Sequence, residues 1–261
     1  MDDRVKSCCA GFYELPLIQS LLGDQWHPGG PTLTRKLANS VLVNRDSRVL
    51  DVASGTGESA RVLAKHFGCH VTGVDFSGEN CARASAMAGE SGLSEKTQFV
   101  EGDAEDLQFA TDSFDIVICE CSLCVFPSRS VALTEMRRVL RPGGRLGISD
   151  VIVIDAIPPS LRNLFGHVLC IGGALSISGY REAFAAAGFA SIRSRDASYV
   201  LGDMIDRVER RARAARELLN GESIELQPGW TVSRAEMIDA RNFVRSGGVG
   251  YAMISGRKPG D

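Results

Sequence analysis

The chain has 261 residues, of which 44% are hydrophobic and 23% charged, and its formal net charge is −3. This length suits one large domain with a substantial core, and the composition is that of a globular protein. The small negative charge argues against a general nucleic-acid binder, which needs clustered positive charge. The first residues lack the pattern of a secretory signal, and no apolar stretch is long enough to span a membrane. We therefore expect a cytoplasmic protein that binds neither nucleic acid nor membrane.

The leading residues 1–34 are broken by proline and glycine, and we expect them to be irregular and to cover a cleft. Thr32 or Thr34 is expected to cap a helix that follows. Apolar runs then alternate with helical patterns. The expected strands are 48–52, 70–74, 97–101, 114–119 and 145–153, and the expected helices between them are 58–67, 79–91 and 131–140. Strands that alternate with helices pair in parallel through right-handed crossovers. The sequence therefore predicts an α/β fold with a Rossmann-like, doubly wound, mostly parallel sheet.

The pattern changes after residue 155. The expected elements are helical stretches at 158–170, 178–187 and 203–219 and strands at 189–195 and 247–257. We accordingly divide the chain into an N-terminal cover segment (1–34), a Rossmann-like core (35–157) and a C-terminal helical elaboration (158–261). This last part is expected to complete the sheet and to lie on the substrate side.

A glycine turn follows the first expected strand, in the segment VLDVASGTGE at 49–58. Such a turn lets a ligand approach the backbone at the switch point of an open sheet. The glycine spacing and Asp75, twenty residues after Gly55, also fit a dinucleotide site, so a nicotinamide reductase is one alternative. Asp51 argues against it, because a carboxylate beside the turn repels a pyrophosphate and attracts an ammonium or a sulfonium. With Asp103, three aspartates follow successive strands, and we interpret them as parts of one site.

These segments resemble those of class I S-adenosylmethionine-dependent methyltransferases. The matching pieces are VLDVASGTG at 49–57, GVDFS at 73–77, EGDAEDLQF at 101–109, FDIVICE at 114–120 and RVLRPGGRL at 138–146. The resemblance implies that the core binds S-adenosylmethionine as cofactor. It assigns the cofactor contacts to Asp51, Ala53, Gly55, Gly57, Asp75, Phe76, Asp103, Ala104 and Cys119. Many members have glycine where this chain has Ala53.

Eight cysteines are present, and in a reducing compartment they are expected to be free thiols or ligands of metals and metalloids. Three of them lie in CECSLC at 119–124, at the strand end where the transferable methyl group should point. Cys69 and Cys81 are expected to be buried packing residues. A structural zinc site at 119–124 is an alternative, although no second paired cluster supports it.

The placing of two thiols further resembles the arsenite methyltransferase family. Cys121 follows the fourth strand, and Cys170 opens CIGGALSISGY at 170–180, which AAAGF follows at 185–189. The resemblance implies that Cys121 and Cys170 hold trivalent arsenic, with Cys8 or Cys9 as a third, catalytic thiol. Thiolate suits such a soft centre, and a thiol carrier can deliver it. Two alternatives remain, a methyltransferase for a carbon, oxygen or nitrogen centre of a small organic molecule and a metalloid-binding protein without turnover.

Overall fold

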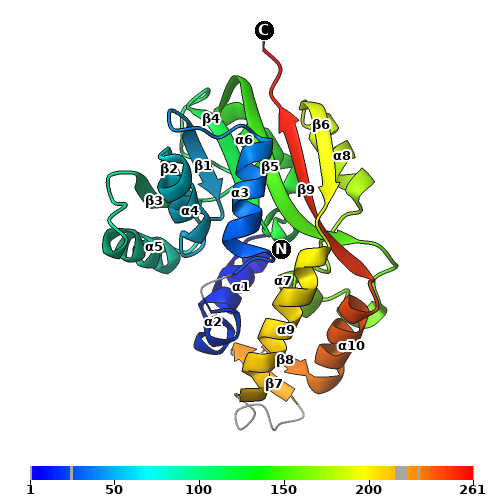
Figure 1. Cartoon of the computed structure of the whole chain (residues 1–261). Coiled ribbons are helices and arrows are strands. Elements are labelled where there is room, and N and C mark those ends of the chain that lie inside the picture. The colour runs from blue at the N-terminus through cyan, green and yellow to red at the C-terminus, as the bar shows by residue number, and fades with distance from the viewer. Residues whose placement is uncertain (1, 24–25, 215–222, 228–229, 261) are drawn as a thin grey trace.

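The computed structural model describes residues 2–23, 26–214, 223–227 and 230–260, and a seven-stranded sheet forms its centre (Figure 1). The strands are β1 (Arg48–Val52), β2 (His70–Asp75), β3 (Thr97–Glu101), β4 (Phe114–Glu120), β5 (Leu140–Val153), β6 (Ala190–Asp196) and β9 (Val249–Arg257). Their order is β3-β2-β1-β4-β5-β9-β6. The first five pair in parallel, whereas β9 runs antiparallel to β5 and β6. The predicted α/β fold with a mostly parallel sheet is confirmed.

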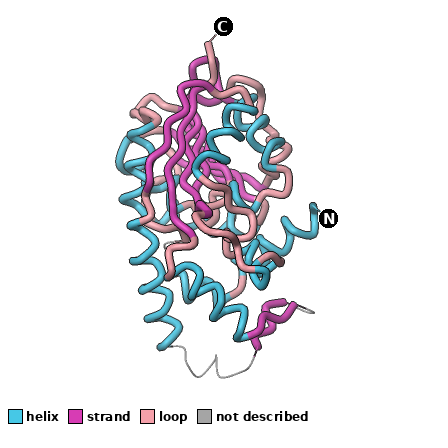
Figure 2. The backbone as a smooth tube through the Cα atoms, turned by 90° about the vertical axis from the view of Figure 1, so that its right-hand side faces the viewer, coloured by secondary structure: helices cyan, strands magenta, loops and turns pink. Residues whose placement is uncertain are grey.

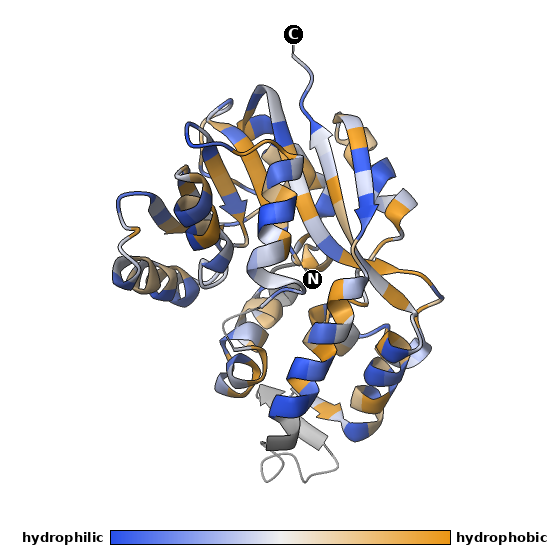
Figure 3. Ribbon diagram, viewed as in Figure 1, coloured by the Kyte–Doolittle hydropathy of each residue, from blue (hydrophilic) through white to orange (hydrophobic). Residues whose placement is uncertain are grey.

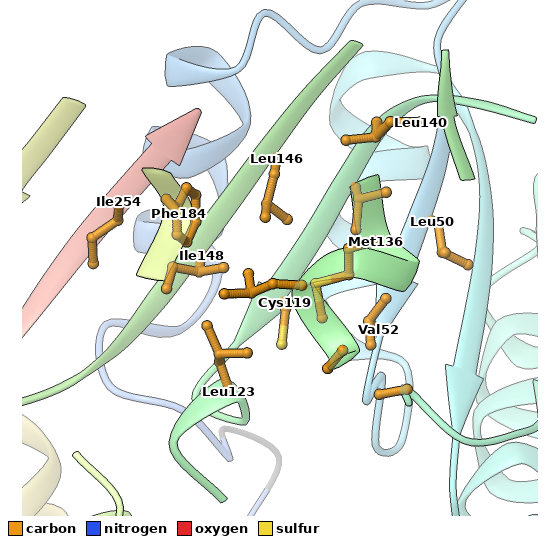
Figure 4. Close-up of a cluster of buried hydrophobic side chains, with 14 of the residues drawn as sticks. Leu50, Val52, Cys119, Leu123, Met136, Leu140, Leu146, Ile148, Phe184 and Ile254 are labelled. Carbon is orange, nitrogen blue, oxygen red and sulfur yellow. The ribbon is translucent and has the colours of Figure 1, made fainter. Parts of the chain in front are cut away.

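Helices cover both faces of this sheet, as the turned view in Figure 2 shows. They are α3 (Gly30–Ser40), α4 (Glu58–Phe67), α5 (Gly78–Glu90), α6 (Arg129–Val139) and α8 (Ile177–Ala186). Successive strand residues point to opposite faces. On β4, Val117 and Cys119 therefore join a core with Met136 of α6 (Figure 4), whereas Ile116 and Ile118 pack with residues of α3 and α4. The apolar colouring of the strands in Figure 3 reflects this burial on both faces.

The remaining elements gather beyond the end of the sheet that lies opposite the C-terminus (Figure 1). They are α1 (Asp2–Glu14), α2 (Pro16–Leu22), α7 (Leu164–Val168), α9 (Tyr199–Ala214), α10 (Arg234–Arg245) and the hairpin of β7 (Ser223–Gln227) and β8 (Trp230–Ser233), together with the 3₁₀ turns η1 (Leu123–Val125) and η2 (Pro159–Leu161). Since the parallel strands end here, these elements enclose the edge where ligands bind in open α/β sheets. Among the described residues, no helix has both the length and the apolar character needed to cross a bilayer.

The prediction that residues 1–34 are irregular is wrong. Residues 2–14 and 16–22 form α1 and α2, and α3 begins at Gly30, ahead of both Thr32 and Thr34. Pro16 is tolerated at the first position of α2, because that backbone N–H has no intrahelical partner. Pro31, which belongs to the proline and glycine cluster that suggested a break, likewise lies in the first turn of α3.

Three further differences lie in the C-terminal part. The helix expected at 158–170 is divided between η2 and α7, and the helix expected at 203–219 begins earlier, at Tyr199, with residues 215–219 outside the described part. The sequence reading missed α10 and the β7–β8 hairpin. A capping box between Ser233 and Glu236 starts α10, and this pair of residues was the available signal.

Candidate active site

A cavity lies at the carboxyl ends of β1, β2, β3 and β4, between the sheet edge and α1. The turn after β1 lines it with residues 53–56, and the following segments line it with Asp75 and Phe76, with residues 102–104 and with residues 120–122. Each lining segment follows a parallel strand. The cavity therefore occupies the switch point of the sheet, where the chain order reverses beside β1.

One face of α1 forms the roof of the cavity. Lys6, Cys9, Ala10 and Tyr13 all line it, and their spacing of three, four and seven residues places them on one side of a helix. Tyr13 stacks against Trp26, with ring centroids 6.0 Å apart. The helix therefore covers the cavity lengthwise with a polar end at Lys6 and an aromatic end at Tyr13.

The turn after β1 adopts left-handed backbone conformations. Ala53, Gly55 and Gly57 have φ values of 57°, 52° and 74°. A Cβ atom on Gly57 would lie 2.6 Å from the Phe99 ring, so this glycine serves the packing of the turn rather than the cavity wall. Ala53 adopts the same left-handed region with a side chain, which L-residues rarely do. The turn brings backbone N–H groups to the cavity at the start of α4.

Three buried carboxylates converge below the turn. Asp51, Asp75 and Glu120 are 2%, 9% and 7% exposed. Burial, followed by the nearby charges of Glu120 and Asp75, raises the pKa of Asp51 well above its usual range. Asp51 is the last but one residue of β1, and Glu120 is the last residue of the neighbouring strand β4. Each lies two positions after a residue of the same core cluster, Val49 or Ile118, so both carboxylates point to the same face of the sheet. The edge therefore attracts a ligand with positive charge.

Three buried polar atoms of residues that line the cavity lack a hydrogen-bond partner within the described part of the chain. They are Oδ2 of Asp51, Oγ of Ser54 and Oδ1 of Asn80. A buried acceptor without a partner is unfavourable, so such atoms indicate a ligand. The ammonium of the methionine part of S-adenosylmethionine would supply a donor to Oδ2 of Asp51. The residues present thus fit this cofactor.

Asp75 has a structural role in addition to its expected contact with the ribose. Its Oδ2 accepts a hydrogen bond from the N–H of Gly55 at 2.7 Å, and its Oδ1 accepts from the N–H of Ser77 at 3.0 Å and from Nδ2 of Asn80 at 3.2 Å. Burial raises the pKa of Asp75, and these hydrogen bonds oppose the rise. Asp75 therefore fixes the glycine turn to the end of β2 while it faces the cavity.

Ion pairs connect α1 to the end of the cavity where the adenine of the cofactor is expected. Lys6 of α1 forms ion pairs of 2.7 Å with Asp103 and 2.6 Å with Glu105. Asp103, Ala104 and Phe76 all line the cavity, as expected for cofactor contacts. Cys119 does not fit that expectation, because its side chain is fully buried in the core beside Leu123 and Met136 (Figure 4). Alternation along β4 turns it away from the cavity.

Glu120, which the sequence did not single out as a site residue, also lines the cavity, as does His27 of the expected cover segment. Oε2 of Glu120 accepts hydrogen bonds from Thr34 at 2.8 Å and Ser59 at 2.7 Å, and its Oε1 accepts one from Ser149 at 3.0 Å. The Nε2 atom of buried His27 lies 3.8 Å from Oε2 of Glu120. The available signal for Glu120 was the carboxylate within CECSLC, which lies at the same edge of the sheet as Asp51.

The two cysteines singled out from the sequence lie together. The Sγ atoms of Cys121 and Cys170 are 3.9 Å apart, although 49 positions separate them, and the Tyr13 hydroxyl is 4.0 Å from Sγ of Cys170. Both cysteines have left-handed backbones, with φ of 55° and 63°. The contact with Cys170, followed by burial, raises the pKa of Cys121 well above its usual range. The pair is therefore protonated and uncharged at neutral pH without a ligand.

The other cysteines divide between the site and the core. Cys9 lines the cavity from α1, and burial, followed by the neighbouring Cys8, raises its pKa to about 12. Cys8 is partly exposed on the same helix. Cys69 and Cys81 are buried elsewhere, as expected of packing residues.

Comparison with known proteins agrees with this geometry. A family model described as a methyltransferase domain matches residues 50–148. An uncharacterised protein of Haemophilus influenzae is 34% identical over 168 residues, which are 63% of this chain and 67% of that protein. The 27-O-demethylrifamycin SV methyltransferase of Amycolatopsis mediterranei is 28% identical over 93% of both chains. The chain spans 31% to 67% of the length of the first curated relatives it matches.

Solved structures share the fold over the whole chain. The crystal structure of the [4+2]-cyclase SpnF has a TM-score of 0.82 and 25% identity, and it covers 100% of this chain and 97% of its own. Phosphoethanolamine N-methyltransferase 2 of Haemonchus contortus, solved with S-adenosylmethionine, has a TM-score of 0.75 at 18% identity over 98% of this chain and 59% of its own.

The chain therefore belongs to the class I S-adenosylmethionine-dependent methyltransferases. S-adenosylmethionine is its cofactor. The comparisons do not support membership of the arsenite methyltransferase family in particular.

The buried charge of Asp51 generates a first prediction. Asp51→Asn keeps the shape but removes a carboxylate from beside Glu120 and Asp75. We expect S-adenosylmethionine to bind about tenfold more weakly, a loss of about 1.4 kcal/mol, while the cofactor-free protein melts roughly 2–4 °C higher because repulsion is relieved. Calorimetric titration and thermal melting measure the two effects. Unchanged affinity together with a lower melting temperature would contradict the proposed role of the charge.

The ion pairs of Lys6 generate a second prediction. Lys6→Ala should loosen α1 from the cavity, so that chymotrypsin cleaves cofactor-free protein faster after Phe12 and Tyr13. Saturating cofactor should slow this cleavage, since it binds beneath the helix. Lys65→Ala, at an exposed site on α4, is the control and should cleave as the wild type does. Equal cleavage of both variants would show that the ion pairs do not hold the helix.

Proposed function

We propose that this methyltransferase transfers the methyl group of S-adenosylmethionine to a small thiophilic acceptor held by Cys121 and Cys170, and that trivalent arsenic is the acceptor this pair suits best. The observation that carries the proposal is the 3.9 Å separation of the two Sγ atoms beside the cofactor cavity. Cys121 itself lines that cavity. Two thiols from separate segments thus face each other within reach of the methyl donor.

The chemistry of the pair supports an uncharged soft acceptor. Sulfur ligands suit soft centres, and the raised pKa of Cys121 keeps its thiol protonated in the buried site. Arsenous acid condenses with two thiols: two As–O and two S–H bonds break, two As–S bonds form, and two water molecules leave. No net charge enters the buried site in this exchange. The third oxygen ligand of arsenic can stay, or Cys9 or a carrier thiol can replace it.

The bound cofactor supplies an activated methyl group on a sulfonium. The protein then has to fix the distance between the acceptor atom and the methyl carbon and the direction from which the acceptor approaches. Two anchoring thiols would orient the lone pair on arsenic toward that methyl group. The lone pair would form the As–C bond while the S–C electron pair stays on the leaving sulfur, so that the positive charge passes to arsenic, which becomes formally pentavalent with the methyl cation as the oxidant. Positioning of this kind accounts for much of a catalytic rate enhancement. The roof formed by Cys9, Ala10 and Tyr13 limits the access of water to the acceptor.

A small organic acceptor is the second candidate. The rifamycin relative, which aligns over 93% of both chains, is named for such a substrate. The buried pair of His27 and Glu120, with Nε2 and Oε2 3.8 Å apart, offers a group that can take a proton from a hydroxyl or an amine. The structural similarity to a cyclase agrees with the general finding that one fold hosts several reactions, so the fold alone does not select the acceptor.

Single replacement of either thiol tests the proposal. Cys121→Ser and Cys170→Ser should each lower methylarsenic formation at least a hundredfold, because serine is a hard ligand and one anchoring point is lost. Cofactor affinity should stay within about threefold of the wild type. The measurement is product formation from arsenite with a reducing thiol present, recorded beside calorimetric binding of S-adenosylmethionine.

Cys69→Ser and Cys81→Ser are the matched controls and should methylate arsenite at the wild-type rate, with at most a modest loss of stability. The Cys8→Ser/Cys9→Ser double variant should slow turnover only if one of these residues is the third ligand. Full activity in Cys121→Ser or Cys170→Ser would refute the thiol site. Turnover of an organic acceptor by the Cys121→Ser/Cys170→Ser double variant would support the second candidate.

A further inference from the structure

A buried carboxylate lies beside the thiol pair. An oxygen of Asp150 and the Sγ atoms of Cys121 and Cys170 all lie within 4.8 Å of one another. These donors come from the end of β4, from β5 and from the segment after α7. We infer that Cys121, Cys170 and Asp150 form a binding site for a thiophilic divalent metal ion, of the Zn(II) and Cd(II) type.

The spacing of the sulfurs suits such an ion. Zn(II) binds thiolate at about 2.3 Å in tetrahedral geometry, which separates two coordinating sulfurs by about 3.8 Å. The observed separation is 3.9 Å. A disulfide would require about 2.05 Å, so the thiols are held apart at the distance of two ligands on one ion. Little rearrangement of the pair is needed for binding.

The third donor is oriented in advance. Asp150 is completely buried, and its two oxygens accept hydrogen bonds from the N–H groups of Cys124 at 2.9 Å and Val151 at 2.8 Å. The side chains of Cys124 and Tyr180 also form hydrogen bonds to this carboxylate, so a metal ion would take the place of one of these side-chain donors. The two backbone hydrogen bonds would continue to fix the plane of the carboxylate.

Binding exchanges protons for metal. Two S–H bonds break, the protons pass to water, and two sulfur–metal bonds form while the ion loses water ligands to Asp150 and the sulfurs. Cys121 is the member of the trio that lines the cavity. The fourth position of a tetrahedral ion therefore opens toward the cavity, where a water molecule or an acceptor atom can bind. An ion in this place would also compete with arsenic for the same thiols.

Titration of the reduced, cofactor-free full chain with cadmium chloride tests the site. We expect one Cd(II) per chain, with thiolate-to-cadmium absorption in the ultraviolet and a matching calorimetric stoichiometry. Cys121→Ser and Cys170→Ser should each abolish this absorption, and Asp150→Asn should weaken binding at least tenfold. Cys69→Ser, which removes a buried thiol elsewhere, should bind as the wild type does.

Absence of Cd(II) binding, or binding that survives both Cys121→Ser and Cys170→Ser, would overturn the site. Unchanged affinity in Asp150→Asn would remove the carboxylate from it. If Asp150→Asn fails to fold, as thermal melting would reveal, the two cysteine variants still decide the matter. The outcome is independent of the proposed function: cadmium binding without arsenite methylation refutes only the latter, and arsenite methylation without cadmium binding refutes only the metal site.

Discussion

Burial of three carboxylates at one edge of a parallel sheet is the constraint on which the site depends. Asp51, Asp75 and Glu120 are all less than a tenth exposed, and each stands where a strand ends. Gathering like charges in a poorly solvated region is unfavourable unless donors or cations compensate them. Hydroxyl and backbone groups satisfy Glu120 and Asp75. Oδ2 of Asp51 retains no such partner within the described residues, and the cationic part of the cofactor would compensate it.

The helix α1 links the two halves of the cavity. Lys6 binds Asp103 and Glu105 at the adenine end, and Tyr13, two turns later, contacts Cys170 and stacks on Trp26. Movement of this helix would therefore change access to the cofactor and to the thiol pair together.

Much of the sheet could be predicted from the sequence, because strands buried on both faces appear as short apolar runs between glycine turns. The bounds of β1 and β3 agree with the prediction, and β2 differs only by Asp75. The roof could not be predicted in this way. Its cavity face combines Lys6, Cys9 and Tyr13, which give no apolar stripe. The proline and glycine cluster at 28–31 resembles a break although Pro31 lies in the first turn of α3.

The thiol pair illustrates the same limit. Cys121 and Cys170 could be named from a resemblance, but their separation and the carboxylate of Asp150 depend on how the segment after α7 packs against β5. Glu120 was missed because it lies within a segment singled out for its cysteines. Contacts between distant segments carry no local periodicity, whereas strands and helices do.

Anomalous X-ray scattering at the arsenic edge tests the central claim most directly. Crystals of the reduced protein would be grown with S-adenosylhomocysteine and soaked in a trivalent arsenical. The account predicts one arsenic peak that bridges the Sγ atoms of Cys121 and Cys170 and faces the cofactor sulfur across the cavity. A peak at Cys69 or Cys81 alone, or no peak beside the cofactor in crystals that contain it, would contradict the account.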